Sequence, residues 1–265
     1  MAEDGNPVEK FYDENAEQEW QRLEKAFSRL EFASAMNLIN KYFPKRGQIC
    51  DIGSGPGRYA IELLLRGYDV TLVDVSHKLL ELARIQITKH NLRAHGYLHT
   101  DASDLGAFGE NVFDAALMMG PQYHLTDRGD RLCALRELKR VLKDNGIAII
   151  TYLNGWGLVR SGISDFPEQY EDRQFVYQLF GVGNLDIWHY TTPQVALGEI
   201  AEAELKIVTY AGAQGFAGGM KPLIEKLADE NPVAYENVIQ TAIQTSELPE
   251  YRDACEHLHI VVTIP

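Results

Sequence analysis

Apolar positions in the middle of this chain form short runs that alternate with stretches of helical periodicity. The first run is Ile49–Ile52, and the second is Tyr68–Asp74, which ends in a carboxylate. Between them, Arg58–Arg66 places apolar side chains three and four residues apart, as on one face of a helix. Short apolar runs are typical of strands buried on both faces of a parallel sheet. The pattern therefore predicts a strand–helix–strand unit over residues 49–74.

The alternation continues along the rest of the chain. Helices are expected after Ser76, a good N-cap, and after Thr192, where Pro193 suits the first turn. A glycine stop is expected at Lys143–Gly146, between a helix and a strand. Further helices are predicted over 8–15, 17–23, 27–42, 126–142, 221–230 and 232–246, and further strands over 94–99, 112–119, 147–153, 204–210 and 257–264. Residues 154–184 are rich in glycine and aromatic residues, and their periodicity is weak.

Three alternating glycines, Gly53, Gly55 and Gly57, follow the first apolar run. Glycine lets the backbone turn sharply and lets a ligand lie against main-chain N–H groups, because it has no Cβ. Strand, glycine turn and helix begin a nucleotide-binding unit, in which Asp74 is placed to accept hydrogen bonds from ribose hydroxyls. The dinucleotide fingerprint places its third glycine one residue later, and Asp51 is awkward beside a pyrophosphate. The loop therefore favours a cationic or amino-bearing ligand.

Composition sets limits on the class of protein. The chain has 265 residues, 45% of them hydrophobic, which is enough for one α/β domain with an insertion or cap. No apolar run is long enough for a transmembrane helix, and the acidic start lacks a signal-peptide pattern. The three cysteines are scattered, without metal-ligand spacing or an even disulfide framework. We therefore expect a reduced, cytoplasmic protein with no bound metal and no membrane partner.

The formal net charge of −13 disfavours nucleic acid as a partner. Proteins that neutralise phosphates usually have a basic patch, and the one short Lys/Arg cluster, Arg136–Arg140, has the pattern of a solvated helix face. A small molecule, a cationic peptide or an amine fits an acidic protein better. The sequence leaves the oligomeric state open.

Two motifs resemble those of class I S-adenosylmethionine-dependent methyltransferases. The first is Asp-x-Gly-x-Gly-x-Gly over 51–57 with the later strand-end Asp74. The second is Gly-Pro-Gln-Tyr-His-Leu over 120–125, which is similar to a motif of bacterial members that act on small molecules. The resemblance covers residues 12–153. It implies a Rossmann-like, seven-stranded, doubly wound α/β sheet whose last two strands form an antiparallel hairpin.

The resemblance also implies a cofactor, S-adenosylmethionine, with S-adenosylhomocysteine as its product. Its methionine part would lie near the glycine loop, its ribose on Asp74, and its adenine near Asp101, where the Ala102 N–H could reach a ring nitrogen. The implied cofactor-binding residues are Tyr12, Gly53, Ser54, Gly55, Gly57, Asp74, Val75, Asp101, Ala102, Ser103 and Met119.

On the acceptor side, Tyr123 and His124 would flank the methyl group and are the candidate catalytic residues. His124 is a possible general base, since its ordinary pKa lies near neutrality; alternatively, it only hydrogen-bonds within its loop. His189 and Tyr190 are further candidate substrate residues. Tyr12 and Trp20 either form a lid over the cofactor, with Trp20 against the substrate, or pack the leading helices on the sheet.

These inferences lead to one expected organisation. Residues 1–46 would form an N-terminal helical lid on a methyltransferase domain over 47–265, with insertions at about 154–190 and 212–250 capping the active site. The expected reaction is methyl transfer to nitrogen or oxygen of a small molecule or peptide, with an amine favoured. Three alternatives remain: an RNA-modifying methyltransferase, an NAD-dependent oxidoreductase and a cofactor-binding protein without turnover.

Overall fold

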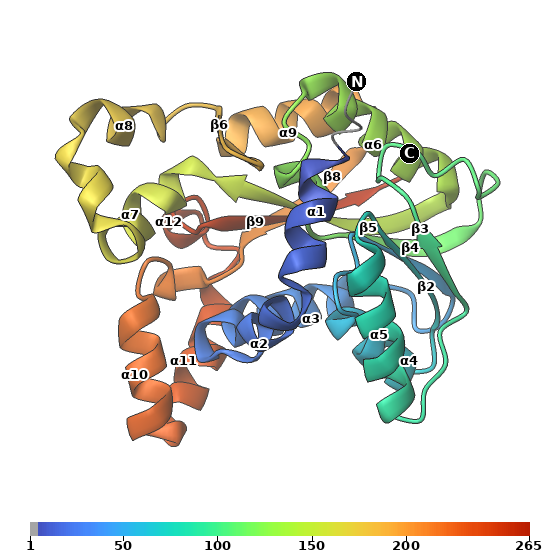
Figure 1. Ribbon diagram of the computed structural model, residues 1–265, viewed down its shortest axis with the longest axis horizontal. Coiled ribbons are helices and arrows are strands. Elements are labelled where there is room, and N and C mark those ends of the chain that lie inside the picture. The colour runs from blue at the N-terminus through green and yellow to red at the C-terminus, as the bar shows by residue number, and fades with distance from the viewer. Residues whose placement is uncertain (1–4) are drawn as a thin grey trace.

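Three helices precede the sheet in the structure, a computed structural model that describes residues 5–265 (Figure 1). They are α1 (Pro7–Glu14), α2 (Ala16–Glu24) and α3 (Ala26–Tyr42). The predicted helices over 8–15, 17–23 and 27–42 are thus confirmed. Residues 1–4, where the lid was expected to begin and where no signal-peptide pattern was found, lie outside the described residues.

A doubly wound sheet forms the centre of the fold, as the periodicity predicted. Its first part comprises β1 (Gln48–Ile52), α4 (Arg58–Leu65), β2 (Asp69–Asp74), α5 (His77–Lys89), β3 (Gly96–His99), β4 (Phe113–Met118), a 3-10 turn η1 (Pro121–Tyr123), α6 (Arg128–Val141) and β5 (Leu142–Asn154). The strands lie in the order β3-β2-β1-β4-β5, all parallel. β9 (His257–Thr263) then pairs antiparallel with β5, and β8 (Lys206–Gly212) pairs antiparallel with β9. The expected seven strands and C-terminal hairpin are therefore present.

Alternation along the strands divides the core into two layers. Cys50, Ile52 and Met118 face one side, where they pack with α6 and with α9 (Pro193–Glu202). Ile49 and Leu117 face the other side, where they pack with α3, α4 and α5. Because both faces are covered, the strands are apolar throughout, and their carboxyl ends form the free edge at which ligands bind in such sheets.

The predicted glycine stop at Lys143–Gly146 is wrong. Helix α6 ends at Val141, and its next residue, Leu142, is already extended and begins β5. Residues 143–146 instead form an irregularity inside β5. Phe113 of β4 pairs with Leu142 and Ala115 pairs with Ile147, so the register shifts between these two pairs. Asn145, with a φ of 60°, takes the left-handed conformation there, and the glycine does not.

The weakly periodic segment after β5 contains structure that the sequence did not predict. It forms α7 (Gly155–Asp165), a 3-10 turn η2 (Pro167–Glu171), α8 (Arg173–Gln178) and a hairpin of β6 (Gly183–Leu185) and β7 (Trp188–Thr191). β7 pairs in parallel with only the last two residues of β5, so the hairpin extends the sheet to nine strands within the described residues. Strands of three and four residues are too short to show a period.

The second insertion packs on the N-terminal helices. It consists of a 3-10 turn η3 (Gly215–Ala217), α10 (Lys221–Glu230), α11 (Pro232–Thr245) and α12 (Pro249–Arg252). Phe27 and Leu30 of α3 share an apolar cluster with Ile224 of α10 and Ile239 of α11. In Figure 1 these helices lie together below the sheet. None of the helices in residues 5–265 is both long and apolar enough to cross a bilayer.

A buried ion pair joins α6 to α9 behind the sheet. Arg131 and Glu199 are 3% and 2% exposed, and Arg131 Nη2 donates to Glu199 Oε1 at 2.9 Å. The other terminal nitrogen, Nη1, donates to the carbonyl oxygens of Leu125 and Thr126 at 2.9 and 3.1 Å. The pair therefore ties the loop after η1 to both helices.

Arg131→Met should lower the free energy of unfolding by about 3–5 kcal/mol, because it leaves the buried Glu199 carboxylate with only the longer contact to Arg128 Nε, at 3.8 Å. Urea denaturation followed by circular dichroism measures this loss. Arg136→Met, on the exposed face of the same helix, is the matched control and should change stability by less than about 0.5 kcal/mol. A loss below about 1 kcal/mol in Arg131→Met would contradict this account of the pair.

Candidate active site

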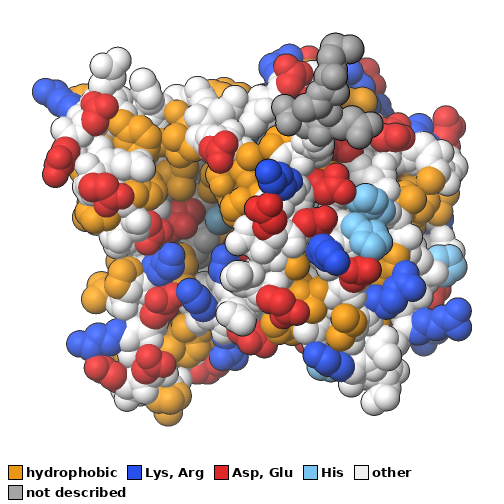
Figure 2. Space-filling view, viewed as in Figure 1, with side chains coloured by type: hydrophobic (Ala, Val, Ile, Leu, Met, Phe, Trp, Pro, Cys, Tyr) orange, Lys and Arg blue, Asp and Glu red, His pale blue; other side chains and the backbone are white. Residues whose placement is uncertain are grey.

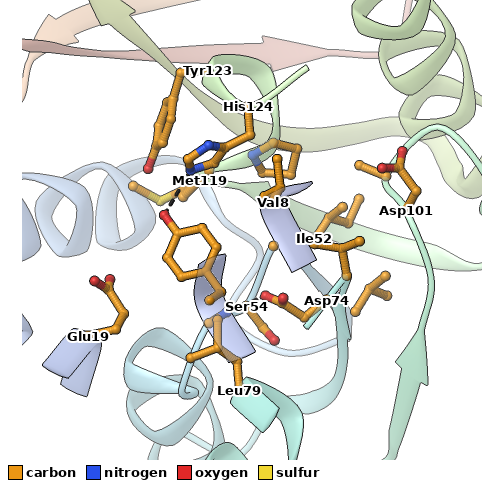
Figure 3. A pocket seen from close by; sticks show the side chains of 18 of the residues that line it. Val8, Glu19, Ile52, Ser54, Asp74, Leu79, Asp101, Met119, Tyr123 and His124 are labelled. Atoms are coloured by element: carbon orange, nitrogen blue, oxygen red, sulfur yellow. Dashed lines mark hydrogen bonds between the residues drawn. The ribbon is translucent and has the colours of Figure 1, made fainter. Parts of the chain in front are cut away.

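A cavity of about 450 Å³ lies at the carboxyl ends of β1, β2 and β4, under α1 (Figure 3). In Figure 3, Asp101, Asp74 and Ser54 follow one another along its floor, and Tyr123 and His124 lie opposite them. Glu19 marks the end away from Asp101. The cavity therefore brings the expected cofactor residues and the Tyr123–His124 motif to one place, at a size usual for small-molecule sites.

The glycine loop needs glycine for its conformation. Gly53, Gly55 and Gly57 have φ values of 71°, 55° and 85°, a region that favours glycine. A Cβ on Gly53 would lie 2.5 Å from the ring of Pro121, so the loop and the Tyr123–His124 segment approach closely at this point. Gly53, Ser54 and Gly55 line the cavity, whereas Gly57 packs against Ala83 of α5 behind its wall.

Asp74 holds the loop in place from the end of β2. Its Oδ2 accepts the Gly55 N–H and its Oδ1 accepts the Ser76 N–H, both at 2.8 Å. Burial raises the pKa of the Asp74 carboxyl to about 6, although these hydrogen bonds oppose the change. The Ser76 hydroxyl in turn donates to Asp13 of α1 at 2.6 Å, so one chain of contacts links β2, the glycine loop and α1.

Asp51 lies beneath the loop and is almost fully buried. Burial, helped by the nearby Asp74 charge, raises the pKa of the Asp51 carboxyl to about 7. Its Oδ2 has no hydrogen-bond partner within residues 5–265. Asp51 does not line the cavity, so it supports the loop from beneath.

The other expected cofactor residues occupy two positions. Val75, Asp101, Ala102 and Met119 line the cavity. Ser103 does not; its N–H and hydroxyl both donate to Asp101 Oδ1, at 2.8 and 2.7 Å. Ser103 therefore orients the Asp101 carboxylate. Both of its hydrogen bonds go to Oδ1, so neither involves the other carboxylate oxygen, Oδ2.

Tyr12 of α1 crosses the cavity and meets His124. Its hydroxyl lies 2.8 Å from His124 Nε2, and His124 Nδ1 lies 3.2 Å from the Ile187 carbonyl oxygen. A carbonyl only accepts hydrogen bonds, so Nδ1 has the proton and Nε2 accepts from the Tyr12 hydroxyl. Burial lowers the pKa of His124 to about 4. His124 is therefore a neutral imidazole whose only free lone pair is directed at Tyr12.

Trp188, which the sequence analysis missed, does not itself line the cavity but packs against two residues that do, Tyr123 and His124. Its ring centroid lies 4.3 Å from that of His124 and 6.0 Å from that of Tyr123, which it stacks upon. Phe11 of α1 packs on its other side at 6.2 Å. The sequence feature that could have identified Trp188 is its position directly before the candidate pair His189–Tyr190.

Three predicted substrate residues lie away from the cavity wall. Trp20 packs against the apolar cluster of α3, α4 and α5. His189, one residue out of phase with Trp188 in β7, points to the other face of the strand, where its Nδ1 lies 2.8 Å from Asn184 Oδ1. Tyr190 directs its hydroxyl to the Gln178 carbonyl at 3.4 Å. The register of a short hairpin decides which of these side chains can reach the site.

The end of the cavity away from Asp101 is charged, and the sequence analysis did not predict this. Arg22 donates to both carboxylate oxygens of Glu19, at 2.7 and 2.6 Å. Arg58 lies over the Phe32 ring, 4.2 Å from its centroid. Glu31, on α3, also lines this end. These residues belong to ordinary amphipathic helices, so no local pattern marks them.

Comparison with known proteins gives a consistent result. Residues 49–146 match a family model described as a methyltransferase domain. The chain is 26% identical over 154 residues to the putative methyltransferase YqeM of Bacillus subtilis, covering 57% of this chain and 61% of that one. It is 31% identical to the glycine/sarcosine N-methyltransferase of Parasynechococcus marenigrum, covering 43% and 40%. The chain thus spans about three-fifths or less of the length of these relatives.

The likeness to a solved structure extends over nearly the whole chain. A possible histamine N-methyltransferase from Thermotoga maritima, a SAM-dependent methyltransferase, superposes with a TM-score of 0.60 and 17% identity, covering 97% of this chain and 100% of that one. At this identity the likeness concerns the fold.

Tyr12→Phe should raise the pKa of His124 above about 4, because the neutral imidazole loses the hydroxyl that donates to Nε2, but burial, the main cause of the low pKa, should keep it below 6.5. Long-range ¹H–¹⁵N correlation spectra across a pH series report both the tautomer and the pKa. Tyr177→Phe, which changes an exposed tyrosine, should leave the titration unchanged. A His124 that already titrates near 6.5 in the unaltered protein, or one that is protonated on Nε2, would disprove the assignment.

Proposed function

Because the chain contains a methyltransferase domain and has the class I methyltransferase fold, we propose that it transfers a methyl group from S-adenosylmethionine to a small molecule or peptide, with an amine favoured. The observation that supports this most is the meeting of the glycine loop, Asp74 and Asp101 with Tyr123 and His124 around one cavity. Net charge of −13 speaks against RNA as the acceptor.

The cavity floor fits the cofactor in three ways. Gly55, with positive φ, has open space where a Cβ would lie, so a ligand can approach its backbone. Each Asp74 oxygen accepts one backbone N–H and keeps a second lone pair for a ribose hydroxyl. Asp101 and the Ala102 N–H would meet the adenine. Val75 and Met119 would line its sides.

Arg58 is a further candidate for the cofactor site. It is the first residue of α4, directly after the glycine loop, and its guanidinium lines the cavity. A carboxylate is favoured at a helix N-terminus and beside a guanidinium. We assign Arg58 to the methionine carboxylate, which would lie at the same loop.

When bound, the cofactor supplies a methyl carbon made electrophilic by its sulfonium. The protein then has to hold the acceptor in line with that carbon, and such positioning provides most of the rate in a displacement of this kind. Tyr123 and His124, with Trp188 packed against them, form the wall at which the acceptor would lie. An amine with a free lone pair needs no base there.

A hydroxyl acceptor would place a different demand on His124. Its Nε2 lone pair is occupied by the Tyr12 hydroxyl, so an acceptor O–H would have to take the place of Tyr12 before its proton could be removed. This occupied base is a second reason to favour an amine. The similar proteins include both a glycine/sarcosine N-methyltransferase and ubiquinone biosynthesis O-methyltransferases, so their names favour neither acceptor atom.

We further propose that α1 acts as the lid. Its Asp13 carboxylate accepts from the Ser76 hydroxyl and from the Lys78 N–H, at 2.6 and 3.1 Å, which attaches α1 to the start of α5. From there Tyr12 reaches across the cavity. The segments over 154–190 and 212–250 would cap the acceptor side, the first through Trp188 and the second through its packing on α3.

Calorimetric titration with S-adenosylhomocysteine tests the proposed function. We expect binding to the unaltered protein, and a dissociation constant at least about tenfold larger for Asp74→Asn, because a hydrogen bond to a charged group is worth about 1.5–3 kcal/mol. Asp69→Asn, at the exposed start of the same strand, is the matched control and should bind normally.

The same titration with NAD separates the proposal from an oxidoreductase. Binding of NAD without S-adenosylhomocysteine would overturn the proposed cofactor. If S-adenosylhomocysteine binds, the protein should next be incubated with S-adenosylmethionine and a panel of amines that includes glycine, sarcosine and histamine. We expect S-adenosylhomocysteine to form as the product with at least one of these amines. A protein that binds the cofactor and methylates no acceptor on a broad amine, hydroxyl and peptide panel would be the non-catalytic alternative.

A further inference from the structure

Glu31 places a carboxylate in the acceptor end of the cavity without a strong protein partner. The nitrogens closest to its oxygens are His259 Nε2 at 3.7 Å and His257 Nδ1 at 3.9 Å, both beyond hydrogen-bond distance. Arg22, which lines the same end, donates two short hydrogen bonds to Glu19 instead. Glu31 thus lies within ion-pair distance of the two histidines but accepts no hydrogen bond within 3.5 Å among the described residues, which leaves lone pairs of its carboxylate for a ligand.

The residues behind Glu31 are built into the protein interior. His259, in the middle of β9, is fully buried, and neither of its ring nitrogens has a hydrogen-bond partner among the described residues. Burial opposes the charge of Glu31, but His257, His259 and Arg22 hold the pKa of its carboxyl below the usual range. Glu31 is thus an anion at neutral pH, supported by polar groups on one side and open to the cavity on the other.

Aromatic rings border the same space. Tyr59 of α4 and Tyr123 of η1 line the cavity, and the Tyr123 ring lies 5.7 Å from that of His257. After burial, the Glu31 charge is the next largest cause that raises the pKa of Tyr123, so its field reaches the residue expected to flank the methyl group. A carboxylate among aromatic faces is the surrounding that proteins use for ammonium groups. Figure 2 shows the surface hollowed between the α7–α8 side and α1, with acidic and histidine side chains inside.

We propose that Glu31, with Tyr59 and Tyr123, forms a subsite for a positively charged amine of the acceptor. This inference rests on the proposed methyl transfer and names the charge of its substrate. Two nearby cations would otherwise favour an anion: Arg58, assigned above to the cofactor carboxylate, and Arg22, which is paired with Glu19. An acidic acceptor is therefore the alternative that the test must separate.

Such a subsite would also assist the reaction itself. An ammonium group bound at Glu31 has no free lone pair, so it would first have to lose a proton to solvent; the neutral nitrogen would then form the new N–C bond while the C–S bond breaks and the sulfur keeps the electron pair. Positive charge thus moves from sulfur to nitrogen, and the proton that a primary or secondary amine then has in excess goes to solvent. A fixed carboxylate beside the nitrogen stabilises the charge that develops there.

The test measures binding of charge-matched probes to the protein saturated with S-adenosylhomocysteine, by NMR titration. The probes are phenethylamine and its uncharged isostere 2-phenylethanol, benzylamine and benzyl alcohol, and the anion 3-phenylpropanoate. We expect at least one amine to bind about tenfold more tightly than its alcohol, and 3-phenylpropanoate to bind no better than the alcohols.

Glu31→Gln should reduce this preference for the amine about tenfold, with S-adenosylhomocysteine binding unchanged as proof that the cavity is intact. Glu81→Gln, which removes an exposed carboxylate of α5, should leave the preference as it is. Equal binding of amines and alcohols, preferred binding of the anion, or a preference that survives Glu31→Gln would each overturn the proposal.

The comparison of amines with alcohols and with the anion needs only the unaltered protein. The proposal can therefore be refuted even if the Glu31→Gln variant fails to fold. Failure of S-adenosylhomocysteine to bind would instead refute the proposed function. Amine and alcohol titrations of the ligand-free protein would then decide the Glu31 subsite separately.

Discussion

The buried carboxylate of Asp74 joins the three segments that border the cavity. It accepts one N–H from the glycine loop after β1 and one from Ser76, just before α5. The Ser76 hydroxyl in turn donates a hydrogen bond to Asp13 of α1. A carboxylate held this deep in a protein needs such donors, because burial without them is costly. The loop conformation, the helix start and the position of α1 therefore depend on one side chain at the end of β2.

The position of α1 in turn determines the state of His124. The Ile187 carbonyl fixes the proton on Nδ1, and Tyr12 takes up the remaining lone pair. Burial then keeps the ring neutral by lowering its pKa. The availability of this base is thereby coupled to the N-terminal helix: with α1 docked through Asp13, His124 is a hydrogen-bond acceptor for Tyr12.

The two ends of the cavity are built from different parts of the chain. Asp74, Asp101 and the glycine loop lie within residues 49–146, the segment that matches the methyltransferase domain model. Glu31 comes from α3, and the histidines behind it come from β9. Trp188 comes from the hairpin inserted after β5. The proposed cofactor residues other than Tyr12 thus lie within the matched segment, together with Tyr123 and His124, whereas Glu31 lies outside it.

The sequence by itself determined the sheet, the glycine loop and the strand-end acids, because these depend on local features: apolar periodicity, glycine at positive φ and residues that follow a strand directly. It failed where local signals were short or ambiguous, as at Lys143–Gly146 and in the β6–β7 hairpin, whose register packs Trp188 against Tyr123 and His124 and turns His189 toward Asn184. Only the tertiary structure decided that Tyr12 meets His124 and that Glu31 lies before His257 and His259. These residues sit on helices and strands far apart in the chain. They meet because apolar packing positions α3 and β9, while the hydrogen bonds of Asp13 attach α1 to the start of α5.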